Sequence, residues 1–382
     1  MNKLEYKLSE YEKRAYPEWK RVGGITPIDN AVSTHKGETA IKGLSKWKNR
    51  GAKIYRITNT DKDLDDIYYV PYAEELAAFD EYKYGTDLKY VLQGESLFGT
   101  GYIIQIPDNL VIEEPLIIDY LVSEDNPSMI DHTFILVGEN SKANIVIRYA
   151  QSDMQMAGYH NGLTKVYAKK NSNLLLTKLQ MFKDQVVHID NTVSILENDS
   201  KVTYSSFDFG GSKIVTDYSS YLVGDRSMSK TVTAYLGDGE RKLDIGYNVT
   251  HIGKRSESLI ECKGALLDNA KKIFRGNLKF VRGAKKSIGK ESEFVLLLDK
   301  GVHSDAIPAL LCDEDDVIGE HAASAGQVDE QQLFYLMSRG FSVNEAKKMV
   351  IHGSFSVVID LLPNQALKDQ VEDELGRRLL DA

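Results

Sequence analysis

The sequence predicts a mainly β protein, a β-solenoid whose short strands stack coil upon coil, with helical regions at both ends. Two observations predict the solenoid. Segments typical of strands follow one another from about residue 100, and a serine-containing polar turn recurs between them at nearly constant spacing. A third observation predicts the helical end, because apolar residues recur at spacings of three and four after Gln327. We therefore divide the chain into a mostly helical N-terminal region (1–95), a solenoid core (96–325) and a helical C-terminal region (326–382).

Length and composition restrict the function. A chain of 382 residues has room for a large core, and its net charge of -9 disfavours binding to nucleic acid or to anionic membranes. Cys262 and Cys312 lie 50 positions apart, which indicates neither a disulfide framework nor a zinc site. The charged start of the chain has no apolar leader, and no later run has the ~20 apolar residues of a membrane span. These features predict a soluble cytoplasmic protein with no nucleic-acid or membrane partner.

The N-terminal region shows two helical segments. Leu4, Leu8, Tyr11 and Ala15 form one stripe of a helix over residues 3–16. A second helix is predicted at 72–79, which is rich in good helix formers. The intervening residues 17–70 give no clear pattern, and their structure stays open.

The solenoid prediction depends on a repeat. Strand-like runs begin at Gly101, and each later polar turn contains a serine followed by a further strand. Successive serines are separated by 31, 28, 27, 29 and 31 residues, and they are Ser141, Ser172, Ser200, Ser227, Ser256 and Ser287. Each repeat contains at least two strands, which bury their apolar faces only when the coils stack.

The C-terminal region changes from the strand pattern to the helix pattern. Val328, Leu333, Phe334, Leu336 and Met337 are spaced as one buried face of a helix, which Asp329 caps and Gly340 ends. We expect the helices that follow to close the exposed end of the solenoid, since an open sheet edge promotes association with other edges.

Common enzyme signatures are absent from the sequence. It contains no phosphate-binding loop, no G-x-S-x-G, no H-E-x-x-H and no G-x-G-x-x-G motif. Gly253-Lys254 and Gly289-Lys290 lack the flanking residues of a nucleotide-binding loop. The chain is therefore expected not to hydrolyse ATP by itself and not to be an enzyme.

Glu320 and His321 are the candidate metal ligands, because they combine a carboxylate with an imidazole at the junction of strand and helix. One such pair is an incomplete site, and a lone histidine before a helix is more often structural. On a strand these neighbours also point to opposite faces, so one of the two would face any given site.

The remaining candidates have structural interpretations. Cys312 and Cys262 lie in apolar runs and are expected to be buried. The acidic residues 313–316 lack the glycine-punctuated spacing of a calcium loop and are expected to form a solvated turn. Three further histidines have no ligand-like neighbours and are interpreted as structural, namely His160, His188 and His303.

Four sequence blocks resemble the SufB/SufD family, the scaffold proteins of the SUF iron-sulfur cluster assembly system. Their order and spacing, together with the repeat between them, match this family from about residue 100 to residue 380. The blocks are Gly101–Pro107 with Glu113–Leu116, His132–Glu139, Asp315–Ala322 and Gln327–Gly340.

The resemblance implies a right-handed parallel β-helix and a C-terminal region that docks a SufC-type ABC ATPase. It also implies pairing with a SufB-type paralogue, or with a second copy of the chain. His321 matches the histidine that is implicated at the cluster-building interface of SufD-type chains. No tightly bound cofactor is expected, although iron or a cluster is expected to be held transiently in the complex.

Departures from the family pattern favour a SufD-like chain. Ala322 stands where SufB-type chains carry a glutamate, and residues 301–307 contain no counterpart of the essential SufB cysteine. Gly319 stands where SufD-type chains often carry a cysteine, and the segments Glu320-His321 and Ile351-His352-Gly353 are more SufB-like. The subtype therefore stays open at this point.

Our main hypothesis from the sequence is a SufD-like scaffold subunit. The alternatives are a SufB-like cluster scaffold and an exported type of β-helix enzyme that acts on polysaccharide. The enzyme would need charged residues grouped on one face of the solenoid, and an export signal is not apparent in this chain.

Overall fold

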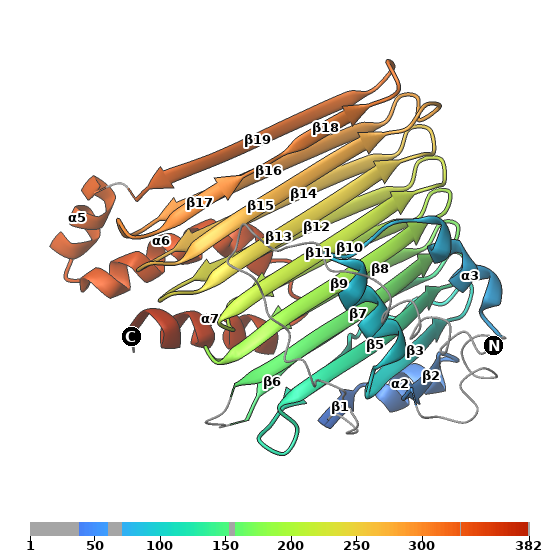
Figure 1. Cartoon of the computed structure of the whole chain (residues 1–382), viewed down its shortest axis with the longest axis horizontal. Coiled ribbons are helices and arrows are strands. Elements are labelled where there is room, and N and C mark those ends of the chain that lie inside the picture. Colours follow the sequence, from blue (N-terminus) through green and yellow to red (C-terminus); the bar gives the residue numbers. More distant parts are fainter. Residues whose placement is uncertain (1–37, 60–70, 153–156, 329, 381–382) are drawn as a thin grey trace.

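The computed structural model describes residues 38–59, 71–152, 157–328 and 330–380. Within these residues the chain winds into a parallel β-solenoid of about eight coils, built from two facing sheets (Figure 1). The fold class predicted from the sequence is confirmed. The helix expected at residues 3–16 lies outside the described residues.

Each coil contributes one strand to each sheet. Sheet A contains, in spatial order, β1 (Glu38–Lys42), β4 (Leu116–Val122), β6 (Lys142–Gln151), β8 (Asn173–Gln180), β10 (Lys201–Asp208), β12 (Met228–Gly237), β14 (Glu257–Leu266), β16 (Ile288–Leu297) and β19 (Ile318–Gln327). Sheet B contains β2 (Lys53–Ile57), β3 (Thr100–Ile106), β5 (Ser128–Val137), β7 (Gly158–Ala168), β9 (Val186–Leu196), β11 (Lys213–Leu222), β13 (Lys242–His251), β15 (Lys271–Phe280) and β17 (His303–Ala306), while β18 (Ala309–Cys312) also pairs with β15.

The recurring serine marks the corner between the two sheets. The residue before each serine has a positive φ, for example 57° at Arg226 and 54° at Arg255, which turns the chain sharply. At four of the six corners the serine hydroxyl donates to the carbonyl three residues earlier, as Ser227 Oγ does to Gly224 O at 2.7 Å. This bond closes the corner and favours a serine at this position of the coil.

Strand residues alternate between the lumen of the solenoid and its outer surface. Inward side chains from both sheets form one continuous apolar core that includes Ile145, Leu176, Tyr204, Tyr247 and Val295. Stacked in-register strands place each inward residue directly above its counterpart in the preceding coil. The lumen is therefore packed with side chains, and polar residues within it need partners inside the column.

The N-terminal region contains two strands as well as helices. Strand β1 pairs antiparallel with β4, and β2 pairs antiparallel with β3, so they cover the first edges of both sheets. Helix α2 (Leu44–Asn49) lies between them, while α3 (Ala73–Ala78), the 3-10 helix Phe79–Glu81 and α4 (Leu88–Ser96) follow. Helix α3 agrees with the helix predicted at 72–79, whereas the two strands lie in the stretch that the sequence left open.

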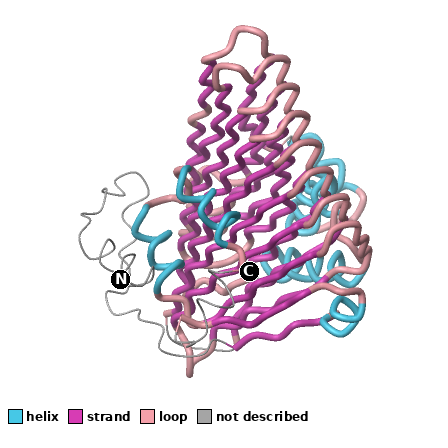
Figure 2. Tube along the Cα trace, turned by 90° about the vertical axis from the view of Figure 1, so that its right-hand side faces the viewer, coloured by secondary structure: helices cyan, strands magenta, loops and turns pink. Residues whose placement is uncertain are grey.

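The C-terminal helices are α5 (Glu330–Ser338), α6 (Val343–Ile359) and α7 (Gln365–Leu380). Helices α6 and α7 cover the outer face of sheet A, and α5 packs against α6. Helix α6 packs against β12 and β14, and the α4 segment packs against sheet B on the other side of the column (Figure 2). In the described part of the chain no helix is long and apolar enough to cross a membrane.

This placement corrects the expectation that the C-terminal helices close the end of the solenoid. Sheet A has an apolar outer face that includes Phe207, Phe209 and Val232, and α6 buries Phe355 and Val358 against it. Phe209 and Phe355 stack with ring centroids 5.8 Å apart. Burial of this face gives more stabilisation than capping the narrow end, because the hydrophobic gain scales with the apolar area buried.

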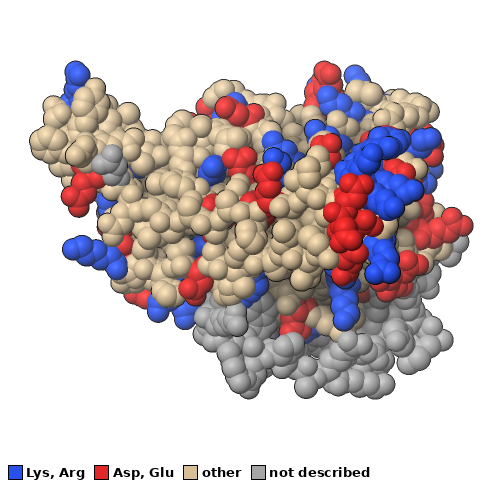
Figure 3. All heavy atoms as spheres, turned by 90° about the horizontal axis from the view of Figure 1, so that it is seen from above, with Lys and Arg blue, Asp and Glu red and all other residues tan. Residues whose placement is uncertain are grey.

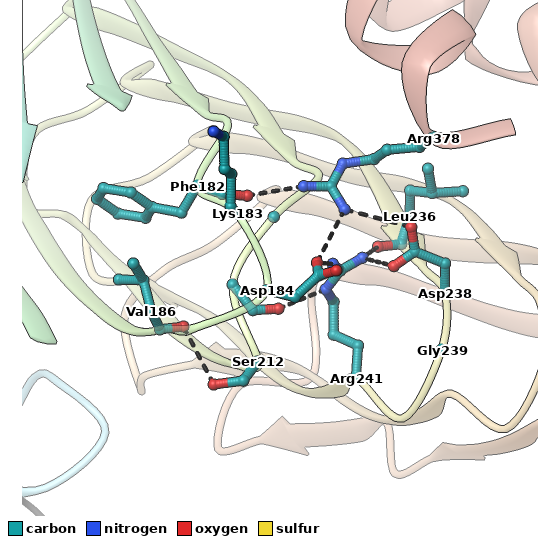
Figure 4. Close-up of polar contacts among 12 residues, drawn as sticks. Phe182, Lys183, Asp184, Val186, Ser212, Leu236, Asp238, Gly239, Arg241 and Arg378 are labelled. Carbon is teal, nitrogen blue, oxygen red and sulfur yellow. Dashed lines mark hydrogen bonds and ion pairs between the residues drawn. The ribbon is translucent and has the colours of Figure 1, made fainter. Parts of the chain in front are cut away.

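An arginine network fastens α7 to the turns of the solenoid (Figure 4). Arg378 donates to the carbonyl of Phe182 at 2.7 Å and to Asp238 at 3.2 Å. Arg241, which is buried, binds Asp238 as well, and its other nitrogens reach Gly211 O and Asp184, each at 2.5 Å. Helix α7 is thereby connected to turns of three successive coils.

The far end of the solenoid is open. Beyond β19 in sheet A, and beyond β17 and β18 in sheet B, the described residues provide no further strand. Figure 3 looks onto this end, where most of the surface is uncharged and the charged side chains gather over the corner turns at the right. Both sheets therefore present unpaired backbone edges at the same end of the molecule.

Candidate functional site

The two predicted metal ligands lie on β19 at the open end, but the strand separates them. Glu320 points to the outer surface, where its carboxylate pairs with Lys290 Nζ at 3.0 Å. His321 lies on the opposite, inward side and is exposed, and no hydrogen bond joins it to the described residues. The two neighbours therefore face opposite ways, as expected from the sequence. Glu320 and His321 do not form one site.

The inward neighbour of His321 is a carboxylate that the sequence argument missed. In the register of β16 and β19, Glu291 is directly opposite His321, and Ile260 occupies the same column one coil earlier. The side chain of Glu291 is 3% exposed, and neither of its oxygens has a hydrogen-bond partner among the described residues. A pattern was present in the sequence, since Glu291 precedes His321 by about one repeat and has the same inward phase.

The environment of Glu291 favours its protonated form. Burial, and after it the neighbouring carboxylate of Glu293, raises the pKa of Glu291 to about 7. On the facing sheet stands Gly276, where an added Cβ would lie 2.6 Å from Glu291 Cγ. Glycine at this position therefore leaves the space that the carboxyl group occupies.

A compact polar cluster lies next to this carboxylate in the lumen. Lys272 Nζ donates to Glu293 at 2.8 Å, and the hydroxyl of Tyr235 donates to the same carboxylate at 2.6 Å. Burial lowers the pKa of Lys272 and raises the pKa of Glu293, although the pair stabilises both charges. Lys272 Nζ thus donates to Glu293, and the described residues provide no donor to either oxygen of Glu291.

The two cysteines have different environments. Cys262 is buried as expected, and burial raises the pKa of its thiol well above the ordinary value, which disfavours a reactive thiolate. Cys312 is exposed, so the expectation that it is buried was wrong. It lies on β18 in the last coil, and no strand of the described ranges covers the apolar run to which it belongs.

A second titratable cluster lies deeper in the column. His160 Nε2 lies 2.7 Å from Asp131 Oδ2, while its Nδ1 lies 2.8 Å from His188 Nδ1. Lys178 Nζ contacts Asp190 at 2.7 Å. Burial lowers the pKa of His160 to about 3, so this imidazole is neutral at physiological pH. Both buried histidines act as hydrogen-bonded core residues, in line with their structural interpretation.

The other candidates are at the surface. His303 is exposed and lies 3.2 Å from Asp305, and the acidic residues 313–316 form a turn at the edge of the open end. Among the described residues, no group of three or more His, Cys, Asp and Glu side chains is arranged to hold a metal ion. The acidic turn is thus better described as solvated than as a cation site.

A groove of about 380 Å³ lies between β4, β6 and α7. Its charged residues bind one another, since Arg148 forms two hydrogen bonds with Asp119 and a third with Gln370 at 2.9 Å. With these donors already satisfied, the groove offers no free charge for a ligand, and we do not assign it a function.

Helix α5 is exposed on a face that was expected to be buried. Val328 is buried and Leu333 packs against the apolar cluster of the helical layer. Phe334 is 73% exposed and Met337 is 43% exposed, so the expectation of one buried face holds for only part of the stripe. The exposed apolar set continues beyond the helix and comprises Phe334, Tyr335, Met337, Phe341 and Val343.

The chain matches a family model and several characterised proteins. The model of the SUF system FeS cluster assembly SufBD core domain matches residues 120–354, which is more than half of the chain. The chain is 27% identical over 333 residues to the iron-sulfur cluster assembly protein SufD of Bacillus subtilis, an alignment that covers 87% of this chain and 75% of that protein.

Two further relatives are similar over shorter regions. The chain is 25% identical to the iron-sulfur cluster assembly protein SufB of Bacillus subtilis and to a SufBD family protein of Staphylococcus saprophyticus. Each alignment covers 76% of this chain and 64% of the relative. The chain thus spans less than two thirds of the length of these two relatives.

Proposed function

The chain belongs to the SufBD family of the SUF iron-sulfur cluster assembly system, with SufD-like character, and from this premise we propose that it is a non-enzymatic scaffold subunit. In this role it pairs with a SufB-type paralogue and receives a SufC-type ABC ATPase. Iron and sulfide are its cargo, and clusters form at the interface between the paired scaffolds.

The open end of the solenoid is the observation that carries this proposal. Both sheets end there in unpaired edges, which a second chain of similar fold would extend by adding its own strands. The exposed, inward-facing side chain of His321 lies at this end. Pairing through these edges would enclose His321 between the two scaffolds and provide ligands from both.

The exposed apolar face of α5 is the proposed docking surface for the ATPase. Monomeric proteins rarely expose neighbouring large apolar side chains such as Phe334, Tyr335 and Met337 without a partner. We assign this surface to the ATPase because α5 directly follows β19, the strand at the open end of the solenoid. A motion of α5 would therefore reach β19 and the scaffold interface within a few residues.

The proposed coupling is a population shift. Dimerisation of two ATPase subunits would bring two α5 helices together and favour one arrangement of the scaffold pair over another. Helices α6 and α7 are packed on sheet A and would remain with the solenoid during this motion. The movable part is then α5 together with the edge strand that precedes it.

A double substitution on α5 tests the docking surface. Phe334→Ser with Tyr335→Ser removes two exposed aromatic side chains, and we expect at least a tenfold loss of affinity for the SufC-type ATPase in a pull-down or calorimetric titration. Gln332→Ser on the same helix serves as the matched control and should bind as the wild type does. Deletion of residues 341–382 is less informative, because it strips the apolar cover from sheet A.

Unchanged ATPase binding by the double variant, with an unchanged melting temperature, would contradict the assignment of α5. A melting temperature that falls by more than a few degrees would show that the two aromatics stabilise the chain instead, and this outcome would contradict the assignment as well.

A further inference from the structure

We propose that Glu291 and His321 together bind one divalent cation at the open end of the solenoid. The choice of Fe²⁺ as the natural ion rests on the proposed function, whereas the pair itself rests on the structure. Glu291, and not the sequence neighbour Glu320, is the carboxylate that acts with His321.

Register places the two side chains on the same side of the sheet. Glu291 and His321 are paired positions of the parallel strands β16 and β19, and both belong to the inward set. Neighbouring strands are separated by about 4.8 Å, so an ion between the side chains lies within reach of both. Imidazole nitrogen together with carboxylate oxygen is a ligand set suited to Fe²⁺.

The carboxyl group of Glu291 is unusual because it is buried without a partner. Buried polar groups are almost always hydrogen-bonded, since an unpaired one costs free energy. Along the described lumen, other buried carboxylates have contacts: Glu293 binds Lys272 and Tyr235, and Asp190 binds Lys178. Two carboxylate oxygens without a hydrogen-bond partner, at the mouth of the column, indicate a ligand position.

The neighbouring charges do not satisfy Glu291. Lys290 points outward and pairs with Glu320, and Lys272 donates to Glu293 and to the carbonyl of Asp305. A cation at the pair would supply the missing positive charge. The remaining coordination positions are open to water and to side chains of a facing subunit.

Metal titration of the full chain tests the proposal. Purified protein is titrated anaerobically with Fe²⁺ by calorimetry, and with Co²⁺ by its visible absorption, which reports nitrogen and oxygen ligation. We expect Glu291→Gln and His321→Ala each to weaken binding by about tenfold or more, since each removes one of two protein ligands. Glu320→Gln is the matched control, and we expect it to bind both metals as the wild type does.

Three outcomes would overturn the proposal. They are wild-type affinity in Glu291→Gln, an equal loss of affinity in Glu320→Gln, and no binding by the wild-type chain. Glu291→Gln is expected to fold because glutamine has the same shape, and the exposed position of His321 makes His321→Ala an independent second variant. Association with the ATPase is measured separately, so a failed metal titration leaves the scaffold function standing, and a failed pull-down leaves the cation site standing.

Discussion

Carboxyl groups inside the solenoid have little contact with water, and Asp208 is a clear case. Its side chain faces the lumen, is 2% exposed and accepts one long hydrogen bond of 3.5 Å from Ser206. Burial, followed by repulsion from Asp190, raises the pKa of Asp208 to about 7. The folded protein therefore binds this proton more tightly than the unfolded chain does.

This shift predicts a pH-dependent stability. A raised carboxyl pKa in the folded state costs stability as pH rises from about 4 to about 7, after which the cost is constant. Asp208→Asn removes the ionisation, and we expect it to increase the free energy of unfolding at pH 8 by roughly 2–4 kcal/mol while changing it little at pH 4. Chemical denaturation at the two pH values measures the difference.

The exposed Asp313 provides the control for this experiment. Asp313→Asn should change stability by less than about 0.5 kcal/mol at either pH, because surface substitutions away from special features have small effects. A gain in Asp208→Asn that is equal at pH 4 and pH 8 would show that ionisation of Asp208 is not its cause.

At the scale of secondary-structure elements, the C-terminal helical layer is held by both apolar packing and charge. Helix α7 buries Val371 and Leu375 in the cluster that covers sheet A. Arg378 extends from the same helix and donates to Phe182 O and Asp238, and its Nε also donates to Glu374 Oε1 at 2.6 Å. The helix is thus tied to the solenoid near its C-terminal end.

The two neighbouring arginines of α7 are expected to differ in their contribution to stability. Arg378 is buried within its network, whereas Arg377 is about half exposed and pairs with Glu374. We expect Arg378→Ala to lower the free energy of unfolding by about 2–4 kcal/mol and to increase hydrogen exchange across residues 365–380. Arg377→Ala should cost less than about 1 kcal/mol.

Hydrogen exchange measured by mass spectrometry, together with thermal denaturation, decides this case. Equal losses of stability in the two arginine variants, or unchanged exchange of α7 in Arg378→Ala, would mean that apolar packing alone holds the helix.

At the scale of the whole molecule, the two ends of the column differ. The antiparallel strands β1 and β2 cover the first coil, and the last coil is left open. Exposed strand edges promote pairing with other chains, and natural proteins usually protect them. A solenoid that is protected at one end and open at the other fits a subunit that pairs through its open end.

A backbone substitution tests pairing at this end. Ile318 N donates to Ser287 O at 3.0 Å, so even-numbered residues of β19 direct their N-H groups to β16 and odd-numbered residues direct theirs to the open edge. Ala323→Pro removes an edge N-H and spares the ladder to β16. We expect it to abolish association with a SufB-type paralogue, or self-association, in analytical ultracentrifugation.

Ala323→Ser keeps the N-H group and should associate as the wild type does. Association of Ala323→Pro at wild-type strength would place the interface elsewhere on the molecule. Its melting temperature should remain close to that of Ala323→Ser, because the bonds within the solenoid are retained.

The sequence alone predicted much of this architecture, because its signals are local. Alternation along a strand, the serine at each corner and the change of period after Gln327 each arise within a few neighbouring residues. The same local geometry predicted that Glu320 and His321 face opposite ways. Family membership was also predicted from the order and spacing of four sequence blocks and is confirmed by the match to residues 120–354.

Only the tertiary structure decided which residues meet between coils and which faces are covered. Glu291 is paired with His321 by a register that spans a whole coil, and Cys312 is exposed because the described residues add no coil after its strand. Helices α6 and α7 cover sheet A and leave the far end of the solenoid open, because the outer face of sheet A offers more apolar area to bury than that end does. These outcomes depend on contacts between residues far apart in the chain, and patterns within a few neighbouring residues do not fix such contacts.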